Sequence, residues 1–175
     1  MEMQKAHMQG EEFVISRVFD VPRERVFDAW TQEKHLKEWF GPENCAMVDT
    51  KLDLRPGGFF HYGMRFMDGR VMYGKWIFKD ILRPERLVLI TQFSDARGAL
   101  SRHPGNRDWP RETLSTTTFE EQGGKTLLTL RWAPYQASDV ERKTFMAASA
   151  SMEQGWTGTF KQLDAYLAKA GKGTK

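Results

Sequence analysis

Residues 152–160, Met-Glu-Gln-Gly-Trp-Thr-Gly-Thr-Phe, place two glycines in the middle of a long predicted helix. We expect this helix from about Ser138 to about Lys169, opened by a capping box in which Ser138 and Glu141 bond reciprocally. Apolar residues recur along it at helical spacing, which predicts one buried face. They are Phe145, Ala148, Met152, Trp156, Phe160, Leu163 and Leu167.

Gly155 and Gly158 are costly inside a helix, because each glycine is less favourable than alanine by roughly 1 kcal/mol. They flank Trp156. This arrangement suggests that another backbone or a bound molecule lies close to the helix. We therefore expect a cavity along this face.

The chain before this helix predicts an antiparallel meander. A strand is expected over residues 12–20, followed by two short helices that end at Gly41-Pro42. From about residue 46 to 132, alternating apolar residues and turn signals such as Asp68-Gly69 and Gln122-Gly123-Gly124 predict about six strands. Such a sheet buries its apolar face under the final helix, so the predicted class is an α+β two-layer domain.

The charge pattern argues against nucleic acid as a partner. The 175 residues include 26 Lys and Arg and 23 Asp and Glu, a net charge of +3. The basic residues are scattered among acids, as in Arg23-Glu24-Arg25, rather than gathered into a stripe. We interpret them as a solvated surface.

The single cysteine, Cys45, excludes an intrachain disulfide and a multi-cysteine metal site and favours a reducing, cytoplasmic setting. No apolar run predicts a signal peptide or a membrane span. Residues 1–10 and 171–175 are predicted to be disordered ends around a single domain over residues 11–170.

Several motifs resemble the activator of Hsp90 ATPase homologue family, a START-like branch of the SRPBCC superfamily. The resemblance extends from about Phe13 to Leu167 and depends on the order and spacing of the motifs together. They are Val21-Pro22-x-x-x-Val26-Phe27-x-Ala29-Trp30, Trp39-Phe40-Gly41-Pro42, Asp53-Leu54-Arg55-Pro56-Gly57-Gly58, Pro84-Glu85-Arg86-Leu87-Val88, and Gly155-Trp156 with Leu163 and Tyr166-Leu167.

The resemblance implies a helix-grip fold, in which a curved antiparallel sheet wraps around the C-terminal helix and two short helices separate strands one and two. It also implies an apolar cavity between sheet and helix for a small hydrophobic molecule, without a cofactor. The family title links it to the stress response.

The candidate ligand-binding residues combine large apolar area with indole, phenol and thioether groups. The alternative is that each simply packs the core. The candidates are Trp39, Phe40, Phe60, Tyr62, Met64, Phe66, Trp76, Phe78, Trp109, Met152 and Trp156.

The segment from Ser94 to Pro110 lacks apolar periodicity and is long for a loop inside one domain. We expect either a lid at the cavity mouth, with Trp109 as its apolar contact, or a mobile surface loop. His103 could act as an acid or base only if such a lid closed over a substrate.

The sequence leaves three functional classes open, with a binding protein favoured. No metal, phosphate-loop, dinucleotide or serine-hydrolase motif occurs. A cyclase- or hydratase-like enzyme would need polar groups in the cavity, for which Tyr62, Thr91 and Thr117 are the candidates. A co-chaperone module is the third class, although the namesake's role depends on a further N-terminal domain.

Exposed strand edges permit a homodimer.

Overall fold

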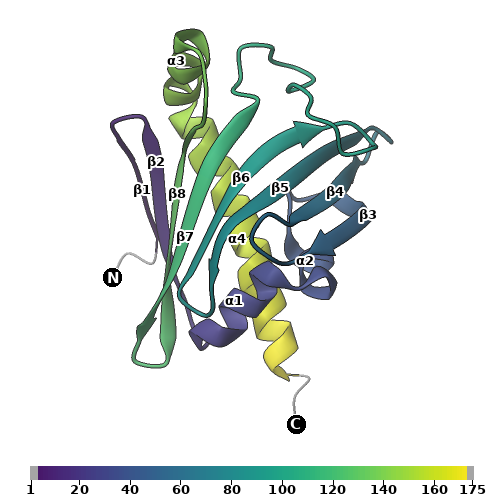
Figure 1. Ribbon diagram of the computed structural model, residues 1–175. Coiled ribbons are helices and arrows are strands. Elements are labelled where there is room, and N and C mark those ends of the chain that lie inside the picture. Colours follow the sequence, from purple (N-terminus) through teal and green to yellow (C-terminus); the bar gives the residue numbers. More distant parts are fainter. Residues whose placement is uncertain (1–3, 173–175) are drawn as a thin grey trace.

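One antiparallel sheet of eight strands curves around a long C-terminal helix (Figure 1). The computed structural model describes residues 4–172. Its elements in chain order are β1 (Gln4–Gln9), β2 (Glu12–Phe19), α1 (Arg23–Thr31), α2 (Glu33–Trp39), β3 (Cys45–Asp53), β4 (Phe59–Phe66), β5 (Val71–Leu82), β6 (Arg86–Ser94), β7 (Glu112–Gln122), β8 (Lys125–Pro134), α3 (Asp139–Ala147) and α4 (Ser149–Lys172).

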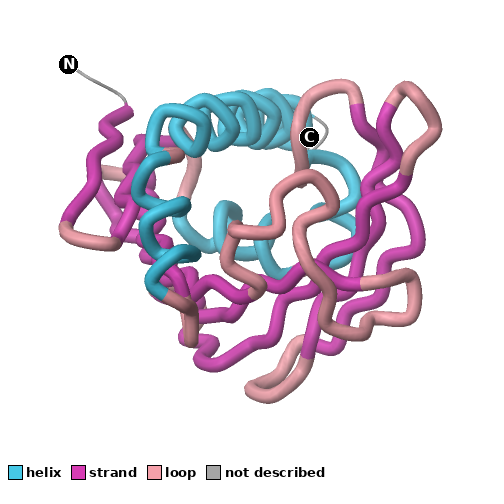
Figure 2. The backbone as a smooth tube through the Cα atoms, turned by 90° about the horizontal axis from the view of Figure 1, so that it is seen from above, coloured by secondary structure: helices cyan, strands magenta, loops and turns pink. Residues whose placement is uncertain are grey.

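The sheet has the order β1-β2-β8-β7-β6-β5-β4-β3, so β3 to β8 form the predicted meander and β2 joins it beside β8. Seen from above, the strands curve around the helical side of the molecule (Figure 2). This arrangement confirms the α+β helix-grip fold. β1 and β3 are the two edge strands, and pairing of a second copy along either edge stays a prediction.

The core lies between the concave face of the sheet, α1 and the C-terminal half of α4. Period-two alternation supplies the sheet side, while α1 contributes Phe27 and α4 contributes Phe160. Phe27 packs edge-on against Phe119 of β7 at 5.2 Å between ring centroids, and Phe160 packs against Phe19 of β2 at 5.8 Å. These contacts fix α1 and α4 against the same sheet face.

The N-terminus departs from the prediction of disorder over residues 1–10. Residues 4–9 form β1, which pairs with β2, so the domain begins before residue 11. Gln4 donates from Nε2 to Thr157 Oγ1 at 2.7 Å, which attaches β1 to α4. Residues 1–3 of the predicted N-terminal end and 173–175 of the predicted tail lie outside the described residues, while Gly171 and Lys172 complete α4.

The extra strand also changes the position of the two short helices. α1 and α2 are present as predicted, but they connect β2 to β3 rather than the first two strands. They lie beside the lower part of α4 in Figure 1. Trp39 at the end of α2 donates from Nε1 to Ala29 O at 2.9 Å, which holds the two helices together.

The predicted single helix over 138–169 is two helices. The capping box at Ser138 and Glu141 is present and opens α3. The helix is interrupted at Ala148, whose N–H bonds to Phe145 O at 3.1 Å, a residue short of the α-helical spacing. α4 then begins at Ser149 and carries both glycines.

Candidate ligand-binding cavity

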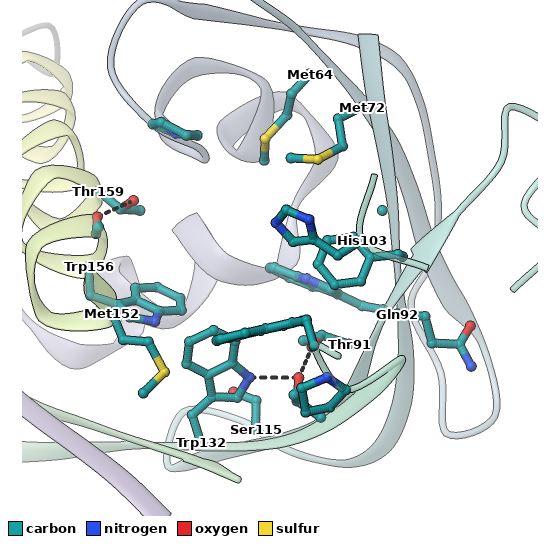
Figure 3. Close-up of a pocket in the computed structure, with 18 of the residues that line it drawn as sticks. Met64, Met72, Thr91, Gln92, His103, Ser115, Trp132, Met152, Trp156 and Thr159 are labelled. Atoms are coloured by element: carbon teal, nitrogen blue, oxygen red, sulfur yellow. Dashed lines mark hydrogen bonds between the residues drawn. The ribbon is translucent and has the colours of Figure 1, made fainter. Parts of the chain in front are cut away.

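A cavity of about 670 Å³ lies between the sheet and the N-terminal half of α4. Its walls come from α1, the turn after α2, strands β4 to β8, the 95–111 segment that joins β6 to β7, and α4. Figure 3 shows side chains of these elements around the open space. The volume falls in the range of pockets that bury a drug-sized molecule.

The helical wall consists of Ala148, at the junction of α3 and α4, and of residues that recur at helical spacing on one side of α4: Ser151, Met152, Gly155, Trp156 and Thr159. A Cβ placed on Gly155 would meet no atom within 4 Å, so this glycine borders open space. The expectation that another backbone packs against the glycines is therefore wrong. Gly158 also has no neighbour within 4 Å of a Cβ, but it does not line the cavity.

All six tryptophans of the chain belong to one network of ring contacts. Trp30 of α1 lies nearly parallel to Trp76 of β5 and to Trp156 of α4, with centroid distances of 6.2 Å in both pairs. From Trp156 the network continues to Trp132 of β8 and then to Trp109, each step 6.1 Å. The sixth member, Trp39, packs behind Trp30 at 5.0 Å.

Tyr62 reaches the cavity wall because its cross-strand partner is a glycine. Tyr62 of β4 pairs with Gly74 of β5. A Cβ at Gly74 would lie 2.5 Å from the Tyr62 Oη, so only glycine admits the ring in this position. Burial raises the pKa of the Tyr62 phenol, and the hydroxyl stays protonated.

A polar cluster interrupts the apolar wall where β6, β7 and β8 meet. The hydroxyls of Thr91 and Thr113 share a hydrogen bond, and Trp132 Nε1 donates to Thr113 Oγ1 at 2.6 Å. These contacts are drawn in Figure 3. Ser115 lies two residues further along β7 and also lines the cavity. The predicted polar residues Tyr62 and Thr91 therefore line the cavity, whereas Thr117 is buried outside it.

The 95–111 segment borders the cavity rather than standing away from it. Its lining residues are His103, Asn106, Trp109, Pro110 and Arg111. Trp109 packs against Phe145 of α3 at 5.5 Å, and His103 packs edge-on against Phe93 at 5.1 Å. Asp95 Oδ1 accepts from the backbone N–H groups of Arg97 and Ala99, which shapes the first turn. The segment therefore forms part of the mouth.

Most of the predicted ligand-binding residues line the cavity: Phe40, Tyr62, Met64, Trp76, Trp109, Met152 and Trp156. Trp39, Phe60 and Phe78 do not, because they are fully buried in the core beneath it. Phe66 does not line it either, since it lies at the end of β4 beside the Asp68-Gly69 turn. Only His103 of the four histidines borders the cavity; His61 bonds to Ser94 on another part of the sheet.

Trp30, Trp132, Thr113 and Gly74 are cavity residues that were absent from the predicted set. Alternation along the strand could have identified Trp132, because even-numbered residues of β8 such as Leu128 and Leu130 are buried on the same face. Trp30 lies in one of the family motifs, but only the packing of α1 against the sheet places it at the cavity wall.

Within residues 4–172, no group of three or more His, Cys, Asp or Glu side chains could hold a metal ion. In the same range, no helix is long and apolar enough to cross a membrane.

The sequence matches the family model described as "Activator of Hsp90 ATPase homolog 1-like protein" over residues 20–168, which includes both short helices, the meander and nearly all of α4. The chain belongs to this family. No curated protein matches it significantly. The family assignment agrees with the resemblance found in the motifs.

Solved structures show the same fold for family-like chains of similar length. A protein from Arthrobacter aurescens is 25% identical, with a TM-score of 0.79, and the match covers 94% of this chain and 91% of that one. Protein Ms6760 from Mycobacterium smegmatis is 24% identical, with a TM-score of 0.75 and coverage of 93% and 95%. Protein NE0264 from Nitrosomonas europaea is 22% identical, with a TM-score of 0.75 and coverage of 94% and 99%.

Proposed function

We propose that this protein binds one small apolar or aromatic molecule in the cavity between the sheet and α4. The observation that carries the proposal is a space of about 670 Å³ bordered by aromatic and thioether side chains. Burying apolar ligand surface against such walls is favourable by roughly 25 cal/mol per Å². Met64, Met72 and Met152 add adaptable contacts to the rings.

The glycine at position 155 supports the proposal. A helix that only packed against the sheet would gain roughly 1 kcal/mol from alanine there. No protein atom fills the space beside Gly155, although this residue lies between Met152 and Trp156 on the cavity side. The glycine thus keeps volume available that a larger side chain would occupy.

The setting we propose is the cytoplasm, because the one cysteine is unpaired. Cys45 is a free thiol, partly buried at the first position of β3. Proteins of oxidising compartments more often pair their cysteines in disulfides.

The test is a titration with 1-pyrenebutanol, a neutral apolar probe, followed by tryptophan quenching and by native mass spectrometry for stoichiometry. We expect saturable binding of one probe per chain. In Gly155→Leu the larger side chain takes up space at the cavity wall that the probe would occupy, so we expect affinity to fall by about tenfold, or about 1.4 kcal/mol.

The matched control is Gly158→Leu, which makes the same change three residues away at a glycine that does not line the cavity. Both variants replace glycine by a better helix former, so both should fold. Equal affinity in the two variants, or no saturable binding to the unmodified protein, would contradict the proposal.

A further inference from the structure

The charges around the cavity are one-sided. Among the described lining residues there is no Asp, Glu or Lys, and the formal charge comes from Arg111. Arg111 is exposed at the mouth, and its backbone N–H donates to Glu141 Oε2 at 3.2 Å. Its guanidinium has no ion pair or hydrogen bond within the described part of the chain. A positive group at the mouth of an apolar cavity favours a ligand with negative charge.

The other polar residues of the mouth are left as hydrogen-bond donors. His103 Nδ1 accepts from the Gly105 N–H at 2.9 Å, so the Nε2–H of that ring is the nitrogen still able to bond. Asn106 Oδ1 accepts from the Asp108 N–H at 3.1 Å, which leaves its NH₂ group as a donor. Both residues line the cavity, and Figure 3 shows the His103 ring beside the open space.

The threonine pair inside the cavity adds another donor by proton counting. Thr91 and Thr113 carry two hydroxyl hydrogens, and their mutual bond uses one of them. Trp132 donates its own N–H to the Thr113 oxygen, so this bond uses neither of the two hydroxyl hydrogens. One hydroxyl hydrogen therefore remains without a partner among the described side chains. Both threonines lie on the cavity wall.

The carboxylates nearest the mouth stand outside the cavity lining, and each already accepts hydrogen bonds. Glu112 accepts from Gln92 Nε2 at 2.8 Å, and Glu141 accepts from the backbone N–H groups of Ser138 and Arg111. Tyr73 donates to Asp49 at 3.0 Å. Glu112 and Glu141 do not line the cavity, whereas Gln92 does and keeps its side-chain oxygen as an acceptor. The donors at the mouth are therefore Arg111, His103 and Asn106.

We propose that the ligand is an apolar carboxylic acid, bound as its carboxylate at the mouth with its apolar body inside the cavity. This inference rests on the proposed function and adds the chemical class of the ligand. A carboxylate only accepts hydrogen bonds and can take several at once, which matches Arg111, the His103 Nε2–H and the Asn106 NH₂ group. An ammonium ligand would find the opposite arrangement.

The test compares three probes with one apolar body: 1-pyrenebutyrate, 1-pyrenebutanol and 1-pyrenebutylammonium, titrated by tryptophan quenching. We expect butyrate to bind at least about tenfold more tightly than butanol, which corresponds to about one charge-assisted hydrogen bond. The ammonium probe should bind most weakly. Arg111→Gln should bring butyrate to the affinity of butanol without changing butanol, while Arg111→Lys should keep most of the preference.

The control variant is Arg107→Gln, which removes an exposed arginine of the same segment that does not line the cavity. It should leave all three affinities unchanged. Equal affinity of the three probes, or an unchanged preference in Arg111→Gln, would overturn the carboxylate inference while leaving the apolar binding site intact. Failure of all three probes to bind would overturn the proposed function as well.

Discussion

The indole rings of Trp30 and Trp156 lie almost parallel, with centroids 6.2 Å apart and planes 18° apart. One ring comes from α1 and the other from α4, so the contact joins the two helices that face the sheet. Both rings border the cavity, but Trp30 is buried and also packs against Trp39, whereas Trp156 is only partly buried. The pair is therefore the junction between core and cavity.

Replacing Trp156 by alanine should affect both stability and binding. A fully buried tryptophan costs about 3–5 kcal/mol when truncated, and a partly buried one less, so we expect a loss of about 2 kcal/mol. Affinity for the pyrene probes should also fall, because one wall of the cavity is removed. Denaturant unfolding and probe titration measure the two effects.

Leu163→Ala is the comparison variant for Trp156→Ala. Leu163 is fully buried on the same helix and does not line the cavity. It should lose about 2–5 kcal/mol of stability and keep its affinity for the probes. If Trp156→Ala behaved in the same way, Trp156 would be a core residue only.

Gly74→Ala should displace the Tyr62 ring from the cavity wall. The added methyl would overlap the phenol, and overpacking of this kind costs about 1–3 kcal/mol. In a Tyr62→Ala background the same change should cost much less, because the ring is gone. A double-mutant cycle in denaturant measures the coupling; additive effects would show that the glycine is not needed for the tyrosine.

The Glu141 carboxylate should stabilise the folded chain at pH values above the ordinary pKa of a glutamate side chain. Burial tends to raise the pKa of this carboxyl, but hydrogen bonds from Ser138 and from the Arg111 backbone outweigh burial and lower it. Because the pKa is lower in the folded chain, the contribution is present above the unfolded value of 4.5 and is lost as the pH falls through the folded value.

Glu141→Gln tests this effect by thermal unfolding across acid pH. The variant should be less stable than the unmodified chain near neutral pH, and the difference should shrink at low pH. Asp139→Asn changes an exposed acid two residues earlier in the same first turn of α3, without a capping-box role, and serves as control. A difference that is constant with pH would contradict the assignment.

His35 should make the contact between α2 and α4 weaker in acid. Burial lowers its pKa below 6.5, helped by Lys34, and its Nδ1 bonds to the Tyr166 hydroxyl. The contact is therefore fully stable above the unfolded pKa and loses stability as the pH falls below it. Unfolding between about pH 7.5 and about pH 5.5 should show this slope, and His35→Phe should reduce it. An unchanged slope would exclude His35 as its source.

Alternation along β4 and β5 was sufficient to predict part of the site. Tyr62, Met64 and Trp76 lie on the predicted face because a strand sends alternate side chains to the same side. The same alternation turns His61, the neighbour of Tyr62 on β4, away from the cavity. Alternation also selects Phe60 and Phe78, because it gives the face of the sheet on which a side chain lies but not whether that part of the face borders the cavity or the core.

Other features depend on contacts between distant residues. β1 has weak apolar alternation, and it is held by its pairing with β2 and by the Gln4–Thr157 bond. The interruption at Ala148 lies within a run of small residues, 147–151, with no proline or glycine to mark it. The donor character of His103 and Asn106 depends on hydrogen bonds within turns, which the residue types alone do not reveal.

The most direct test of the central claim uses fluorotryptophan labelling, because the chain provides its own control. Trp30, Trp76, Trp109, Trp132 and Trp156 line the cavity, whereas Trp39 is buried behind Trp30 with its Nε1 bonded to Ala29. Single Trp→Phe variants assign the ¹⁹F resonances. On titration with 1-pyrenebutyrate, the cavity resonances should shift and saturate together, and the Trp39 resonance should shift least. Resonances that stay unchanged, or a shift largest at Trp39, would contradict a ligand site between the sheet and α4.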